Sequence, residues 1–154
     1  MNSRQTFALA LALGLLALWP ARTPAQEDPA LAEAVRAYAS GMSLATDPAL
    51  VHAADFTGDG RPDVAAVLEG DGRSALVIFN RTDRGYQPHP LYASLPAGAW
   101  NIRAVAPGRH RVLGAEGTVE LTSPAIELIF PGRSSAIYAW RGNRYQVFGT
   151  ENYH

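Results

Sequence analysis

The residues whose types and spacing could bind a metal ion lie in one stretch, 55–63, which reads Asp-Phe-Thr-Gly-Asp-Gly-Arg-Pro-Asp. Aspartates occupy its first, fifth and ninth positions, and the two glycines between them allow a sharp turn. Calcium takes about six to eight oxygen ligands, which a short loop supplies from alternate positions. The spacing therefore predicts a calcium-binding loop.

Five residues of this loop are the expected metal ligands. Asp55, Asp59 and Asp63 would supply carboxylates, Thr57 a neutral hydroxyl, and Arg61 only its backbone carbonyl. Three carboxylates so close together repel one another, and a divalent cation would convert that repulsion into a cross-link. Calcium is favoured over magnesium because the ligand set is flexible and made of oxygen alone.

The same loop has a simpler interpretation that needs no metal. Asp55 and Asp59 could accept hydrogen bonds from their own backbone in a turn rich in aspartate. An EF-hand is not expected, because position twelve of the loop is Ala66 instead of a bidentate glutamate. The apolar run 64–68 that follows is typical of a strand.

The stretch 55–64 resembles the calcium loop of FG-GAP or VCBS-like repeats, which read Asp-x-Asn-Gly-Asp-Gly-x-x-Asp-Leu. The resemblance implies a loop between two strands, with calcium bound by Asp55, Thr57, Asp59, Asp63 and the carbonyl of Arg61. This chain has a single copy, and no Phe-Gly signature precedes it. The whole chain is more similar to small exported bacterial proteins with one such loop, also in its ending 134–145. That resemblance implies a fold and an ion, but no activity.

Residues 1–25 are predicted to be a bacterial Sec-type signal peptide. Arg4 supplies a positive charge, 7–19 is an apolar run, Pro20 ends it, and Ala25 offers a small residue at the cleavage position. The alternative, a retained anchor, is disfavoured because a span needs about 20 apolar residues. We therefore expect a periplasmic or secreted protein, with one domain over 26–154 and no membrane span after cleavage.

The composition excludes several classes of function. The chain of 154 residues has no cysteine, so disulfides and thiolate metal sites are unavailable. Its formal net charge of −1 argues against a nucleic-acid-binding protein, which needs a clustered basic face.

Hydrophobic periodicity predicts a mostly β fold with one N-terminal helix. The helix is expected over 27–40, capped by Asp28, and a helical turn over 47–53. Many short segments separated by turn residues predict an antiparallel sheet, sandwich or rolled sheet of about eight strands. They are expected within 64–68, 75–79, 86–92, 100–105, 109–113, 118–121, 125–130, 135–140 and 144–148. Pro88 and Pro90 predict an edge strand, because each removes a backbone donor.

No catalytic residue is predicted. The four histidines have no metal-ligand spacing, and no nucleophile elbow occurs. Glu120 and Glu127 could form a carboxylate pair. Their alternation with apolar residues is better explained by positions that face solvent on strands.

Three aromatic residues near the C-terminus form a weaker candidate for binding. Tyr138 and Trp140 share a strand face, and Tyr145 can lie across a hairpin from Trp140. They could form a stacking surface for a glycan or a peptide. The alternative, which we favour, is ordinary core packing.

Together these features predict an exported calcium-binding β domain that acts as a binding or interaction module of the cell envelope. Its expected partner is an envelope protein or a glycan. The alternatives are an inhibitor or immunity protein against an envelope hydrolase, and a calcium-dependent enzyme.

Overall fold

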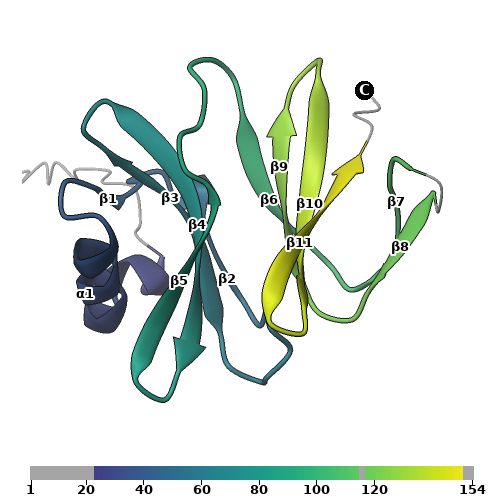
Figure 1. Ribbon diagram of the computed structural model, residues 1–154. Coiled ribbons are helices and arrows are strands. Elements are labelled where there is room, and N and C mark those ends of the chain that lie inside the picture. The colour runs from purple at the N-terminus through teal and green to yellow at the C-terminus, as the bar shows by residue number, and fades with distance from the viewer. Residues whose placement is uncertain (1–22, 115–116, 151–154) are drawn as a thin grey trace, which may run out of the picture.

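Two antiparallel β-sheets face each other, and one α-helix covers the outer side of the first sheet (Figure 1). This computed structural model describes residues 23–114 and 117–150. The described residues form eleven strands and one α-helix, which confirms the predicted mostly β, antiparallel fold with an N-terminal helix.

The helix α1 (Pro29–Tyr38) begins and packs as its sequence predicts. The side chain of Asp28 accepts a hydrogen bond from the N–H of Ala30, at 2.9 Å, and therefore caps the helix. Leu31 and Val35, one helical turn apart, are buried against the first sheet. Within the described ranges, no helix is long and apolar enough to cross a membrane.

Residues 1–22 of the predicted signal peptide lie outside the described residues. The turn η1 (Pro24–Glu27) follows, and its cap is reciprocal, because Thr23 and Gln26 each bond to the backbone of the other. The proposed domain boundary at residue 26 therefore falls within this turn.

The first sheet is built on two strands whose faces are both buried, β3 (Asp63–Gly70) and β4 (Arg73–Thr82). Val77 and Phe79 pack toward α1, while Leu76 and Ile78 pack toward the second sheet. A continuous apolar run is typical of a strand covered on both sides. The predicted central position of 75–79 is therefore confirmed.

Three further strands complete the first sheet. Its order is β1-β3-β4-β5, and β2 also pairs with β3. One edge of the sheet is β5 (Gly85–Tyr92), as its two prolines predict. The sequence prediction lacked β1 (Ser43–Leu44) and β2 (Val51–Ala54). The predicted helical turn 47–53 is wrong after residue 50, because only η2 (Pro48–Leu50) is helical and β2 follows at once.

The second sheet contains four strands in the order β11-β10-β9-β6. They are β6 (Asn101–Val105), β9 (Ala125–Phe130), β10 (Ser134–Arg141) and β11 (Arg144–Thr150). A separate hairpin of β7 (Gly108–Arg111) and β8 (Thr118–Leu121) packs on the outer face of this sheet. Val119 and Leu121 of β8 contact Ala125, Ile137 and Ala139 there.

The solvent-facing interpretation of Glu127, on the same outer side of the second sheet, is wrong. Glu127 is only 4% exposed. Its Oε2 lies 2.6 Å from Nε of Arg103 on β6, and its Oε1 accepts a hydrogen bond from the hydroxyl of Thr150. The carboxylate is thus a hydrogen-bonded part of the interior, whereas Glu120 on β8 is exposed, as expected.

Candidate functional site

The loop 55–63 connects β2 to β3 and closes where Ala54 pairs with Asp63. The second loop residue, Phe56, is fully buried in the core between the two sheets. The hydroxyl of Ser123 donates to the carbonyl of Phe56 at 2.8 Å. The loop is therefore anchored to both sheets by one side chain and one hydrogen bond.

Asp55 closes the exposed half of the loop. Its Oδ1 accepts from the N–H groups of Gly58 and Asp59, and its Oδ2 accepts from the N–H of Gly60, all within 3.0 Å. Gly58 and Gly60 have φ of 76° and 86°, in the left-handed region that favours glycine. These two glycines let the backbone turn so that successive N–H groups point at one carboxylate.

Asp63 closes the buried half of the loop and is fully buried itself. Its Oδ2 accepts from the N–H and the hydroxyl of Thr57, and its Oδ1 accepts from the N–H of Arg81 on β4, at 2.8 Å. Burial raises the pKa of Asp63, although these hydrogen bonds act in the opposite direction. The carboxylate therefore joins the loop to the sheet without a metal.

Asp59 and Arg61 lie on the outside of the loop. Oδ1 of Asp59 accepts a hydrogen bond from the N–H of Arg61 at 2.9 Å. Oδ2 of Asp59 lies 4.0 Å from Nε of Arg61. Arg61 forms an exposed ion pair with Asp83 at 2.8 Å. Asp59 is thus the loop carboxylate with the fewest internal partners.

The expected calcium ligands do not converge on one point in this arrangement. Among residues 23–114 and 117–150, no group of three or more acidic or histidine side chains is placed to hold a metal ion. Each carboxylate oxygen can accept two hydrogen bonds. One oxygen of Asp55 and one of Asp63 accept a single hydrogen bond, so each can still accept another or bind a cation. The carboxylate of Asp59 also has unused acceptor positions. Asp63 already accepts hydrogen bonds from Thr57 and from the backbone of β4. The observed hydrogen bonds are those expected for an aspartate-rich turn without a metal. Calcium binding by this loop therefore stays a prediction.

A second feature is a cleft of about 270 Å³ between β5 and β11, the facing edge strands of the two sheets. The cleft has aliphatic and aromatic walls and one arginine, namely His89, Pro90, Leu91, Tyr138, Arg144, Tyr145 and Val147. Two of the three predicted aromatic residues, Tyr138 and Tyr145, therefore line one cavity.

Trp140, the third predicted aromatic residue, is not among the residues that line this cleft. Trp140 lies opposite Tyr145 in the pairing of β10 with β11, as the sequence predicts. Their ring centroids are 4.9 Å apart. Trp140 also lines a separate hollow beside Thr57 and Gly58 of the loop. The hydroxyl of Tyr145 donates to Oδ1 of Asn80 at 2.6 Å. Burial raises the pKa of Tyr145, so this phenol stays protonated. Trp140 thus packs between the sheets, whereas Tyr145 both packs there and lines the cleft.

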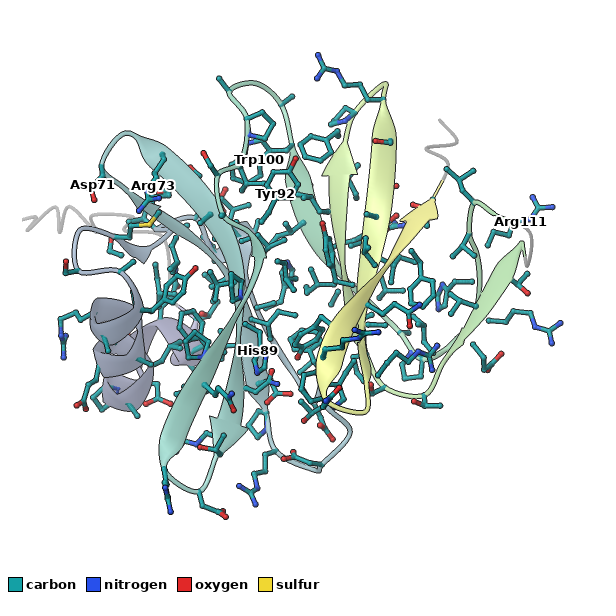
Figure 2. The ribbon with its side chains drawn as sticks, in the orientation of Figure 1. Asp71, Arg73, His89, Tyr92, Trp100 and Arg111 are labelled. Atoms are coloured by element: carbon teal, nitrogen blue, oxygen red, sulfur yellow. The ribbon has the colours of Figure 1, made fainter. Side chains whose placement is uncertain are left out.

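His89 is a site residue that sequence reasoning missed. Its ring lies 5.3 Å from that of Trp140 and 5.6 Å from that of Tyr145, between the two sheets (Figure 2). Nε2 is buried and has no hydrogen-bond partner among the described residues. Burial lowers the pKa of His89, so the ring is held neutral. No local sequence signal marks this position, because His89 is set opposite Ile78, an inward residue of β4, only by the pairing of β4 with β5 in the folded chain.

Comparison of the chain with models of protein families, with curated proteins and with solved structures finds no match. The likeness of the loop to FG-GAP and VCBS-like repeats therefore stays a prediction.

Proposed function

We propose that this protein is an exported binding module of the cell envelope, and that the cleft between β5 and β11 is its ligand site. The observation that carries this proposal is the cleft itself, which combines apolar walls with side chains that have no partner among residues 23–114 and 117–150. A concave, mostly apolar site with a few polar groups is the usual form of a small-molecule site. Export rests on the predicted signal peptide 1–25.

Two side chains of the cleft have hydrogen-bonding groups that no residue in the described part of the chain uses. The guanidinium of Arg144 and the hydroxyl of Tyr138 have no partner among the described residues. The rings of Tyr138 and Tyr145 add flat apolar surface. Such groups hold a ligand by donors and ring faces, which favours a binding role over a catalytic one and a glycan over an extended protein surface.

Binding should be lost when the cleft is filled. We expect Val147→Glu to weaken binding of a soluble envelope oligosaccharide at least about tenfold, because a longer, charged side chain would occupy a cleft of this size. Titration calorimetry of the full chain with neutral and acidic oligosaccharides measures this. Gln146→Glu is the matched control, since it adds the same charge to β11 at an exposed position that does not line the cleft. Equal affinities of the two variants, or no binding of any oligosaccharide, would reject the cleft as the site.

We also propose that the loop 55–63 binds calcium, with Asp55, Asp59, Thr57 and the carbonyl of Arg61 as the accessible ligands. Asp63 would join them only after a rearrangement. The support is the spacing of the aspartates and the acceptor sites that remain on the exposed half of the loop. A bound calcium ion would cross-link this half of the loop and stabilise the fold.

Calcium should raise the melting temperature of the wild-type protein, and Asp59→Ala should abolish that rise. Ligand at a hundredfold excess over its dissociation constant stabilises by about 2.7 kcal/mol, which corresponds to several degrees in a domain of this size. Thermal unfolding in EDTA, in millimolar calcium and in millimolar magnesium measures the effect. Glu33→Ala removes an exposed carboxylate from α1 and should keep the full calcium shift. An identical melting temperature of the wild type in EDTA and in calcium would mean that the loop is a turn without an ion.

A further inference from the structure

The charge of the cleft indicates what it binds. Arg144 is the only formally charged side chain among the lining residues, and its guanidinium has no ion-pair partner in the part of the chain that the structure describes. The buried carboxylate of Asp63, whose charge acts on Tyr145 and His89 of the cleft, already accepts hydrogen bonds at both oxygens. An unpaired arginine at the side of a cavity is complementary to a carboxylate, which it can hold by two parallel hydrogen bonds.

The phenol of Tyr138 supplies a second point of recognition. Its hydroxyl makes no hydrogen bond to any described residue, and burial raises its pKa, so it remains a donor at neutral pH. Tyr138 lies opposite Val147 in the pairing of β10 with β11, so its ring and an exposed aliphatic side chain border the same space. A polar group beside an apolar wall suits a ligand that carries hydroxyls on a compact ring.

The volume of the cleft limits the size of this ligand. Clefts that take drug-sized molecules measure roughly 300–1,000 Å³. At about 270 Å³, this one has room for a single ring and is open to solvent along the edges of the two sheets.

We propose that the cleft binds a carboxylate-bearing sugar ring, with the carboxylate on Arg144, a ring hydroxyl on Tyr138 and the ring face against Tyr145. This inference rests on the proposed binding function and names its ligand class. The sugar is either a free uronic acid or one acidic unit of an envelope glycan, and both present the same chemistry to the cleft.

The test is titration calorimetry of the full chain with glucuronate, glucose and acetate at low ionic strength. We expect glucuronate to bind at least about tenfold more tightly than glucose, and acetate to bind too weakly to measure. Titration with an acidic oligosaccharide that contains glucuronate distinguishes a free uronic acid from a unit of an envelope glycan. If the ligand is a glycan, the oligosaccharide should bind more tightly than glucuronate alone. Arg144→Gln should remove the preference for glucuronate over glucose.

Arg133→Gln is the matched control, because Arg133 is an exposed arginine in the turn between β9 and β10 and does not line the cleft. Its affinity for glucuronate should equal that of the wild type. Equal binding of glucose and glucuronate, or an unchanged preference in Arg144→Gln, would overturn the acidic-sugar inference and leave the binding module intact. A preference for a peptide that ends in a free carboxylate would overturn it too. Failure of every sugar and oligosaccharide to bind would overturn both proposals.

Discussion

Replacing Asp63 with alanine is expected to lower the free energy of unfolding by about 2–6 kcal/mol, even in EDTA. The carboxylate is fully buried and accepts from the N–H groups of Thr57 and Arg81 and from the hydroxyl of Thr57. Alanine would leave two N–H groups in the interior without an acceptor, and each costs about 1–3 kcal/mol. The loop and β4 would lose their direct connection.

The asparagine variant separates hydrogen bonding from burial. Donors approach both oxygens of Asp63, but an amide accepts on one side only, so Asp63→Asn should also be destabilising, although less than alanine. Urea unfolding of both variants in EDTA and in calcium measures the effect. Asp59→Ala is the control, because this exposed carboxylate accepts one hydrogen bond among the described residues, from the N–H of Arg61, and its loss should cost little stability in EDTA. A loss of stability in Asp63→Ala that appears only in calcium would instead make Asp63 a metal ligand.

The regular elements were predictable because their signals are local. The cap at Asp28 and the spacing of Leu31 and Val35 predict α1 within one short segment of chain. The apolar run 75–79 predicts a strand covered on both faces, and such a strand needs two covering layers. The sequence could not show which elements form those layers, because α1 and the second sheet are brought there by tertiary packing.

Glu127 shows where local periodicity fails. Alternation with Ile126 and Leu128 predicts a strand with one wet face, and these two residues are indeed buried between the sheets. On the other side of the sheet, the β7–β8 hairpin packs against Ala125 of β9. The sequence around Glu127 does not predict this packing. A partner from β6, Arg103, then allows the carboxylate to be buried.

The candidate site was predictable only in part, for the same reason. The aspartate spacing and the two glycines predict a tight loop, which is observed. The direction of Asp63 depends on the backbone of Arg81, 18 residues away, and cannot be read from the loop itself. The cleft joins β5 of one sheet to β11 of the other, so His89 and Arg144 come together only in the folded chain.

Phe56→Ala is expected to lower the free energy of unfolding by about 3–5 kcal/mol, the usual cost of deleting a fully buried phenylalanine. Phe56 fills the core between the sheets, beside residues of both. The truncation should leave a cavity, because close-packed neighbours relax only in part. Urea unfolding measures the loss, and Phe56→Leu is the control that keeps most of the volume and should cost clearly less.

The same variant tests whether the loop and the cleft are coupled. Tyr138 and Tyr145 of the cleft pack on the core cluster that contains Phe56, and Ser123, in the connection between β8 and β9, donates to the Phe56 carbonyl. A loosened anchor should therefore reduce ligand affinity as well as stability, at a temperature where the variant is still folded. Unchanged affinity with reduced stability would mean that the cleft forms independently of the loop, and that calcium in the loop and a ligand in the cleft act without influence on each other.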